Sequence, residues 1–510
     1  MTNVSDRRLI HVHLLLALAI ALAMLLSVLA VQPAAALVTF DVNSTVDASD
    51  AVPGNGVCET ATAGECTLRA AIEEANALSD GTEVFFITVY NPGTYVLNDQ
   101  LVVTGQNISI FGTGNEHEVI IDGNNATRVF DIGAASISIF WVTIQGGKNV
   151  NSVVVGGHWH GGAIHNHGTL TMSNVIVQDS VIASDTPGAA TCTTHCGGAI
   201  YNAATASLDN VAFVNNRNEF VDAEAHGGAV ANAGTMTVTN ATFSGNSTAG
   251  GQGSAIYNIG TSTLSYVTVA DNGAGPAIAH AGGTLDITAS IAANNTGDNC
   301  LGSLTSGGYN LSDDGTCTAS FTGTGDLDNN PNANLGPLAD NGGNTWTHAL
   351  LTGSVAINHI PPGAVECGTT VTTDQRGESR PQGAGCDIGA FEVIFTQTYF
   401  QACLYAGSLS KVSFISDSTA TTVNCGRGTA VVLLAGGDVG VDVYHACLYA
   451  GSLSKVGETA PTSCGRGEAI SLVKGIDLQG CLYAGSLSRL SASPPSDCGR
   501  GVVAGLETEP

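Results

Sequence analysis

A short glycine motif recurs in the middle of the chain and limits its fold more than any other feature. Gly-Gly-Ala followed by Ile or Val, or a close variant, begins at five places whose starts lie 36, 30, 26 and 22 residues apart: Gly161, Gly197, Gly227, Gly253 and Gly275. Repeats of about 20 to 50 residues are typical of stacked units, each of which buries its apolar residues against its neighbours. The motif therefore predicts a solenoid.

The residues within each copy favour strands. Apolar residues recur at fixed positions in the four clearest copies, at Met172, Leu208, Val238 and Leu264, at Val175, Val211, Ala241 and Val267, and at Val177, Phe213, Phe243 and Val269. Alternation with a period of two, broken by Gly and Asn, is typical of short strands and turns, whereas a helix requires spacings of three and four. The predicted fold class is all-β, a single-stranded parallel β-helix with about eight to ten coils between residues 85 and 310.

Two columns of asparagine run through the repeats. The first is Asn166, Asn202, Asn232 and Asn258, and the second, eight residues later, is Asn174, Asn210 and Asn240, with Tyr266 in the fourth copy. Coils stacked at about 4.8 Å place like residues on one another, and asparagine amides can then hydrogen-bond along the axis. Both columns are predicted to be structural ladders rather than binding residues.

The N-terminus carries the pattern of a secretory signal peptide. Arg7 and Arg8 precede an uncharged apolar run from Leu14 to Val31, and small residues follow as far as Ala36. Cleavage is expected after Ala36. The apolar run is 18 residues long, which is long for a signal peptide, so an uncleaved membrane anchor is the alternative. The remainder of the chain is expected to be exported.

All fourteen cysteines follow the predicted signal peptide. An even number of cysteines in an exported chain is typical of a disulfide framework. Cysteines adjacent in the sequence form seven expected pairs: Cys58/Cys66, Cys192/Cys196, Cys300/Cys317, Cys367/Cys386, Cys403/Cys425, Cys447/Cys464 and Cys481/Cys498. Zinc binding is the alternative for Cys192 and Cys196, because His195 stands between them.

The charge balance argues against nucleic acid as a partner. The chain has 15 Lys and Arg against 43 Asp and Glu, a formal net charge of −28, whereas nucleic-acid binders concentrate basic residues on one surface. Disorder is also excluded, because hydrophobic residues make up 44% of the chain and can build a core.

Two flanking segments resemble known families of exported bacterial proteins. Cys66-Thr-Leu-Arg69 and the residues up to Asn76 resemble the CSLREA-type segment, with Thr67 and Ala70 in place of Ser and Glu. Leu335–Gly343, Thr347–Leu350, Thr373–Pro381 and Asp387–Glu392 resemble the choice-of-anchor Q family. The resemblances imply that the parallel β-helix is right-handed and pectin-lyase-like, and that it is displayed at a bacterial surface or secreted from it. The first segment is also expected to form a short amphipathic helix that caps the solenoid.

Three copies of another unit follow residue 395. Cys-Leu-Tyr-Ala-Gly-Ser-Leu-Ser begins at Cys403, Cys447 and Cys481, each copy has a basic residue next, and each runs to a Cys-Gly-Arg-Gly sequence. Each copy is interpreted as a small strand pair closed by one disulfide. Three equivalent cations could contact an anionic polymer with avidity, and solvated surface charges are the alternative interpretation.

The coils contain few residues that could catalyse cleavage of a polysaccharide. Pectate-lyase chemistry needs Ca²⁺ on carboxylates and a strong base, and Lys148 and Arg217 are the candidate bases. No set of three carboxylates beside such a base is recognised in the sequence. A glycosidase needs two opposed carboxylates, and the doublet Asp313-Asp314 in a Gly-flanked turn is better explained as turn chemistry.

Histidines cluster around the first glycine motifs. His158, His160, His165 and His167 lie close together, His195 follows one coil later, and His226 occupies the position of His160 in a later copy. A transition metal shared by His160 and His226 is the hypothesis, and a solvated corner lined by histidine is the alternative.

The sequence thus predicts five segments: a signal peptide (1–36), an N-terminal cap (37–84), β-helix coils (85–310), a choice-of-anchor Q-like part (311–395) and three C-terminal repeats (396–510). The expected function is non-catalytic, a secreted or surface rod that contacts extracellular or cell-wall polysaccharide. The alternative is a Ca²⁺-dependent polysaccharide lyase of acidic polysaccharide. Membrane contact is expected only through an uncleaved N-terminal anchor.

Overall fold

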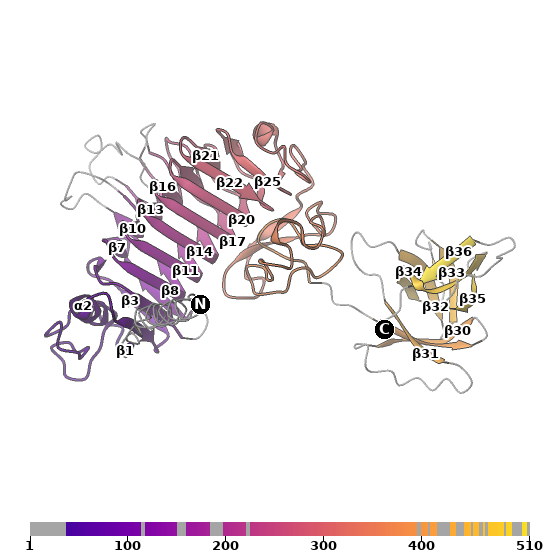
Figure 1. Cartoon of the computed structure of the whole chain (residues 1–510), viewed down its shortest axis with the longest axis horizontal. Coiled ribbons are helices and arrows are strands. Elements are labelled where there is room, and N and C mark those ends of the chain that lie inside the picture. Colours follow the sequence, from indigo (N-terminus) through magenta and orange to yellow (C-terminus); the bar gives the residue numbers. More distant parts are fainter. Residues whose placement is uncertain are drawn as a thin grey trace, which may run out of the picture.

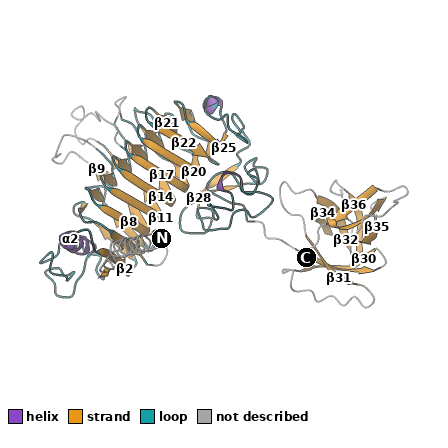
Figure 2. Cartoon of the chain, viewed as in Figure 1, coloured by secondary structure: helices purple, strands orange, loops and turns teal. Residues whose placement is uncertain are grey.

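A computed structural model of the chain describes residues 37–113, 118–149, 160–183, 197–220 and 225–394, together with strands between residues 399 and 506 and the pair 463–464 (Figure 1). The predicted signal peptide and the pair Cys192/Cys196 lie outside the described residues. Strands dominate the described part, which contains one α-helix, α2 (Leu68–Leu78) (Figure 2). No helix among the described residues is long and apolar enough to span a membrane.

The strands of residues 37–312 stack as coils of a parallel β-helix. The longest sheet has the order β1-β2-β5-β8-β11-β14-β17-β20-β22-β25, with β3, β6, β23 and β26 beside that path, and all its strands pair in parallel. Its strands are β1 (Leu37–Val42), β2 (Val84–Val89), β3 (Gly93–Val96), β5 (Ile108–Gly112), β6 (Val119–Asp122), β8 (Ser136–Gln145), β11 (Thr169–Gln178), β14 (Thr205–Val214), β17 (Thr235–Ser244), β20 (Thr261–Ala270), β22 (Thr284–Thr288), β23 (Ile291–Ala293), β25 (Thr305–Gly308) and β26 (Leu311–Ser312).

Two shorter parallel sheets complete each coil. One has the order β24-β21-β19-β16-β13-β10-β7-β4 and the other β18-β15-β12-β9. Their strands are β4 (Leu101–Val103), β7 (Phe130–Ile132), β10 (Ile164–Asn166), β13 (Ile200–Asn202), β16 (Val230–Asn232), β19 (Ile256–Asn258), β21 (Ile278–His280) and β24 (Cys300–Leu301), and β9 (Lys148–Asn149), β12 (Val181–Ile182), β15 (Arg217–Asn218) and β18 (Ser247–Thr248). The prediction of a parallel β-helix is confirmed.

Inward side chains form one continuous core. Val177, Phe213, Phe243 and Val269 occupy one register column, and all are buried. The rings of Phe213 and Phe243 stack with centroids 4.7 Å apart. Like residues therefore meet along the axis, as the repeat predicts.

The two glycines of the repeated motif have different roles. The first has a left-handed φ, for example 65° at Gly197, which favours glycine. The second has no room for a side chain, because a Cβ on Gly198 would lie 1.9 Å from the carbonyl oxygen of Gly228 on the next coil. One glycine therefore allows the turn, and the other allows the coils to approach.

The first asparagine column is a hydrogen-bonded ladder. Nδ2 of Asn166 donates to Oδ1 of Asn202 at 2.6 Å, Asn202 donates to Asn232 at 2.7 Å, and Asn232 donates to Asn258 at 2.8 Å. These side chains are buried. A second ladder, which the sequence analysis missed, joins Asn216, Asn246, Asn272 and Asn295 with the same bond at 3.0 Å.

The second predicted column is a corner rather than a ladder, and that prediction was wrong. Asn174, Asn210 and Asn240 have φ between 50° and 57°, as do Trp141 on the preceding coil and Tyr266 on the following one. Asparagine tolerates this left-handed region better than most residues. The amides bond to different partners: Asn174 to Ser173, Asn210 to Asp209 and Asn240 to the Thr373 carbonyl.

The helix α2 caps the first coils. Thr67 is its N-cap and accepts a hydrogen bond from Ala70 N, while Leu68, Ala71, Ile72 and Ala75 are buried in the same core as Phe85. Arg69 makes a bidentate ion pair with Asp47 at 2.7 and 2.9 Å. Glu74 accepts hydrogen bonds from the backbone of Gly54 and Gly56. The capping helix is confirmed, and Cys58 and Cys66 form a disulfide beside it.

Residues 335–393, the lateral segment, cover part of the long sheet. The segment contains the antiparallel pair β27 (Leu335–Ala339) and β28 (Thr347–Leu350), the 3-10 turn η2 (Ala364–Glu366) and the disulfide Cys367–Cys386. Leu338 and Trp346 pack on the outward residues Ile176, Ala212 and Val214. Gln375 accepts a hydrogen bond from Thr242 at 2.7 Å, and Ala390 N donates to Thr268 at 3.0 Å.

The C-terminal repeats form three-stranded antiparallel units. Each Cys-Leu-Tyr strand pairs with the following Ser-Leu-Ser strand and with the strand after the Gly-Arg-Gly sequence. The strands are β29 (Tyr399–Tyr405), β30 (Ser408–Ile415), β31 (Thr429–Leu434), β32 (Val443–Tyr449), β33 (Ser452–Gly457), β34 (Glu468–Tyr483), β35 (Ser486–Ser491) and β36 (Val502–Leu506). The expected strand pair thus has a third strand. Cys464 is disulfide-bonded, and Cys425 and Cys498 lie outside the described residues.

Candidate functional site

Of the histidines named from the sequence, His160, His165, His167 and His226 lie at the sheet from β7 to β19, and His158 and His195 lie outside the described residues. Asp131, His165, Tyr201, Ala231 and Tyr257 are the central residues of successive strands and pair in register. Because the residues before and after each are inward and buried, these side chains form one outward column. This column brings an acid, an imidazole and a phenol together on three adjacent coils, and Tyr257 follows two coils beyond Tyr201.

His160 and His226 lie beside this column, each against a tyrosine. The ring of His160 stacks on Tyr201 with centroids 3.9 Å apart, and that of His226 stacks on Tyr257 at 4.0 Å. Nδ1 of His226 accepts a hydrogen bond from Gln252 N at 3.0 Å. The two histidines occupy equivalent positions two coils apart, so about 10 Å separates them.

That separation argues against the metal shared by His160 and His226. Two nitrogens on one cation, each bound at about 2.1 Å, lie within about 4.2 Å of one another. Among the described residues, no group of three or more His, Cys, Asp and Glu side chains is placed to hold a metal ion. The rings of His160 and His226 are buried against tyrosines, so the alternative of a solvated corner also differs from the structure.

Asp131, His165 and His167 form a hydrogen-bonded chain on the same face. Nδ1 of His165 lies 2.9 Å from Oδ1 of Asp131, and Nε2 of His165 lies 2.8 Å from Nε2 of His167. Burial lowers the pKa of His165, and nearby Arg128 lowers it further, although the hydrogen bond to Asp131 opposes the shift. Burial alone would raise the pKa of Asp131, but His165 and Arg128 outweigh it and lower that pKa.

Lys148 and Arg217 share a column on the four-stranded sheet β18-β15-β12-β9, with Val181 between them. They lie two coils, or about 10 Å, apart. Arg217 is half-exposed and pairs with Glu219 at 3.1 Å. Nearby Asp179 has a pKa raised by burial, an effect that Arg217 partly opposes. The two candidate bases therefore lie on one face, but no group of three carboxylates accompanies them within the described residues.

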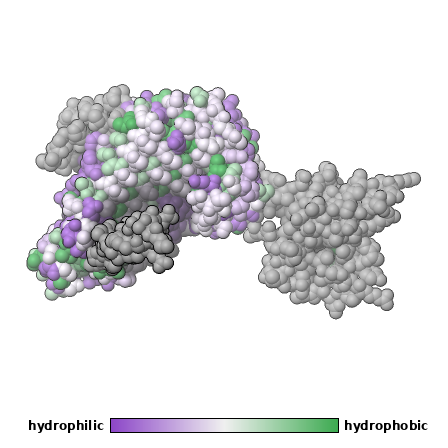
Figure 3. All heavy atoms as spheres, viewed as in Figure 1, coloured by the Kyte–Doolittle hydropathy of each residue, from purple (hydrophilic) through white to green (hydrophobic). Residues whose placement is uncertain are grey.

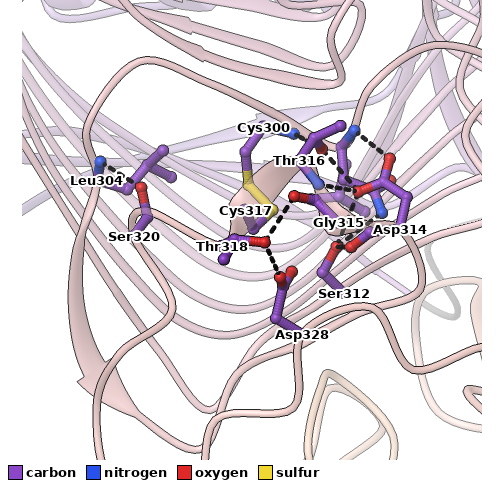
Figure 4. Close-up of a disulfide and its surroundings, with 12 residues drawn as sticks. Cys300, Leu304, Ser312, Asp314, Gly315, Thr316, Cys317, Thr318, Ser320 and Asp328 are labelled. Carbon is purple, nitrogen blue, oxygen red and sulfur yellow. Dashed lines mark hydrogen bonds between the residues drawn. A yellow bond between two sulfur atoms is a disulfide. The ribbon is translucent and has the colours of Figure 1, made fainter.

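The doublet Asp313-Asp314 supports a turn beside the disulfide Cys300–Cys317 (Figure 4). Asp314 is the N-cap of the 3-10 turn η1 (Gly315–Cys317) and accepts hydrogen bonds from Thr316 and Asn299 N. Burial alone would raise the pKa of Asp314, but these bonds outweigh it and lower that pKa. Asp313 accepts from Nδ2 of Asn299 at 2.7 Å. These contacts agree with the interpretation as turn chemistry.

The residues that resemble the choice-of-anchor Q motifs make contacts within the lateral segment and with β20. Arg380 and Glu392 form a fully buried ion pair at 2.8 Å, and Arg376 pairs with buried Asp374 at 2.7 Å. Burial and the neighbouring Glu392 carboxylate raise the pKa of Asp387 to about 7. Arg380 also lies over the ring of Tyr266 on β20, 4.5 Å from its centroid.

The sequence analysis missed a strip of aromatic side chains on the outside of the first coils. Phe86, Phe111, Phe140 and Trp141, here called the aromatic strip, come from β2, β5 and β8 and are all partly exposed. Phe111 stacks on Phe140 with centroids 4.9 Å apart, Phe86 meets Phe111 edge-on at 5.3 Å, and Trp141 lies 5.7 Å from Phe140. The period-two pattern could have revealed these rings, because each Phe follows or precedes an inward residue.

The strip continues the corner on which the lateral segment lies. That segment contacts the corner residues Asn174, Asn210 and Asn240, which all belong to later coils than Trp141. On the face drawn in Figure 3, hydrophobic residues of the described β-helix are scattered among hydrophilic ones.

No family model matches the chain, and neither a curated protein nor a solved structure matches it. The β-helix is therefore assigned from strand register alone. The resemblances to CSLREA-type and choice-of-anchor Q proteins stay predictions.

Proposed function

We propose that the chain is a non-catalytic protein, secreted by or displayed on a bacterium, whose β-helix contacts extracellular or cell-wall polysaccharide. The aromatic strip carries this proposal. Contiguous, partly exposed aromatic rings mark interaction surfaces more often than isolated ones do. The flat rings offer apolar area against which the C–H faces of sugars can pack.

The strand register supports a binding role for the aromatic strip, because the fold does not require these rings. Phe140 pairs with Ser173, which is followed along the axis by Asp209, Thr239 and Ser265. The corner position of Trp141 is occupied by Asn on the next three coils. The fold therefore accepts small polar residues at both places, and the rings add exposed apolar area without being required for stacking.

Charge favours a neutral polysaccharide over a polyuronate. The chain has a formal net charge of −28, and a surface of one sign repels a polymer of the same sign. Exported localisation is supported by the three described disulfide pairs, which persist in oxidising compartments.

The test compares the full chain with the double variant Phe140→Ser/Trp141→Asn, whose new residues are those of the next coil. Co-sedimentation with insoluble neutral polysaccharides and a glycan array would measure binding. The variant should bind at least about tenfold more weakly, since a buried aromatic contributes a few kcal/mol to an interface. Leu351→Ser, which removes an exposed apolar residue of the lateral segment, is the control and should bind normally.

Two results would overturn the proposal. One is unchanged binding by the double variant. The other is release of unsaturated product from polygalacturonate with Ca²⁺, lost in Lys148→Ala or Arg217→Ala. The second result would favour the lyase alternative, because those candidate bases lie on one face of the coils.

A further inference from the structure

His165 and His167 differ from the histidines considered so far, because their ring nitrogens face one another. Both lie at the end of β10, separated by inward Asn166, which is fully buried. The Nε2 atoms are 2.8 Å apart, whereas the ring centroids are 4.3 Å apart and the rings are nearly perpendicular. The centroid distance is too short for two rings placed end to end, so the rings meet at an angle.

We propose that His165 and His167 form a chelating site for a divalent transition metal, with Cu²⁺ as the preferred ion. Two nitrogens bound at about 2.0–2.1 Å to one cation, with an angle near 90° between the bonds, lie about 2.9 Å apart. The observed distance between the Nε2 atoms is 2.8 Å. Neighbouring positions on a tetragonal ion, the geometry of Cu²⁺ and Ni²⁺ with nitrogen ligands, match this spacing.

Asp131 orients the first ligand. Its Oδ1 lies 2.9 Å from Nδ1 of His165, so the proton of that ring belongs on Nδ1 and the lone pair on Nε2. Metal-bound histidines commonly donate their other N–H to a carboxylate, which fixes the ring. Arg128, 3.7 Å from the same Oδ1, offsets the charge of Asp131, so the imidazoles rather than the carboxylate would attract the ion.

Binding requires one proton to move. With the lone pair of His165 on Nε2, the hydrogen bond between the rings uses the Nε2–H of His167 as donor. When an ion replaces that bond, neutral His167 changes tautomer: solvent takes the proton from Nε2 and supplies one to Nδ1, which frees the Nε2 lone pair for the ion. His167 is exposed, so the exchange costs little, and water would complete the coordination.

The repeat provides a variant that removes one ligand without disturbing the coil. The positions equivalent to His167 on the next two coils hold Ala203 and Ala233. His167→Ala therefore places directly after β10 the residue that the two following coils already have there. Asp131→Asn tests the orienting carboxylate, and His280→Ala, which removes a partly exposed histidine of β21, is the control.

The experiment titrates tag-free full-length protein with CuSO₄, followed by calorimetry and by electron paramagnetic resonance. The unmodified chain and His280→Ala should show one saturable site with hyperfine splitting from two imidazole nitrogens. His167→Ala should bind at least about tenfold more weakly and lose one nitrogen, and Asp131→Asn should bind about tenfold more weakly. Equal affinity in His167→Ala, or a spectrum without two imidazole nitrogens in the unmodified chain, would refute the site.

Discussion

The two asparagine columns have different structural roles, and substitutions at Asn232 and Asn210 would distinguish these roles. Asn232 lies in the middle of the first ladder: its Oδ1 accepts from Asn202, and its Nδ2 donates to Asn258, to the Thr261 carbonyl and to Ser262. The side chain is buried. Asn210 lies at the corner, donates to Asp209 and has a buried Oδ1 with no hydrogen-bond partner among the described residues.

Asn232→Ala should therefore be far more costly than changes at Asn210. It deprives the Nδ2 of Asn202, the N–H of Gly234 and the Thr261 carbonyl of one bond each. The Asn232 side chain takes part in six hydrogen bonds with described residues, and partners such as Asn202 Nδ2 and Gly234 N keep another bond. Since each bond contributes about 0.5–1.5 kcal/mol net, the free energy of unfolding should fall by at least about 3 kcal/mol. Asn210→Gly should change it by less than about 1 kcal/mol, because glycine accepts the left-handed φ of 52°.

Urea unfolding followed by far-UV circular dichroism would measure the difference, and hydrogen exchange would show whether the loss is local. Amides of β16, β17 and β19 should exchange faster in Asn232→Ala, since coils of a solenoid depend on their immediate neighbours. Asn210→Ala, which keeps the left-handed corner without an asparagine, should cost about 1–2 kcal/mol. If Asn210→Ala destabilised the chain as much as Asn232→Ala, the distinction between ladder and corner would be wrong.

Three further predictions concern the lateral segment, the coils and the C-terminal repeats. Because the pKa of Asp387 is raised to about 7, its contribution to stability is full below the ordinary pKa and is lost as pH rises through 7. The thermal midpoint should thus decrease as the pH rises from about 4 to 7, and the decrease should be smaller in Asp387→Asn. Gly198→Ala should prevent folding or lower the unfolding free energy by at least about 3 kcal/mol, measured by urea unfolding, since the new Cβ would meet the Gly228 carbonyl oxygen. Replacing Lys411, Lys455 and Arg489 with Ala in one variant should weaken binding to anionic polymers by a larger factor than the three single substitutions multiplied together, because avidity is lost. Salt-dependent retention would measure the binding.

The sequence was sufficient for the architecture because the same residues recur on every coil. The inward columns, such as Val177 to Val269, and the ladder from Asn166 to Asn258 follow from period and offset alone. The prediction for the second asparagine column was wrong because asparagine is favourable both in a hydrogen-bonded ladder and at a left-handed φ. Only the backbone conformation distinguishes these two roles. The ladder from Asn216 to Asn295 escaped notice because no glycine motif marks it.

The candidate sites were harder to predict because they depend on which residues meet across coils. His160 and His226 share a position in the repeat, and that equivalence suggested a common metal. A shared position on coils that are not adjacent separates two residues instead of joining them. His165 lies on β10 and His167 directly follows it, but the orientation of the His165 ring depends on Asp131 of the preceding coil, which no local pattern indicates.

In a solenoid, a residue that differs from those at the equivalent position on the neighbouring coils is informative, because those neighbours show which residues the position accepts. Ser173 and Asn174 satisfy the positions of Phe140 and Trp141, and Ala203 satisfies that of His167. The departing residues therefore carry exposed rings or nitrogens that the stacking does not need. Substitution to the column residue should leave the unfolding free energy within about 1 kcal/mol, whereas substitution inside a ladder should lower it. If substitution to the column residue weakened ligand binding and also lowered the free energy of unfolding, the residue would be required for the fold. If it weakened ligand binding alone, the residue would serve binding.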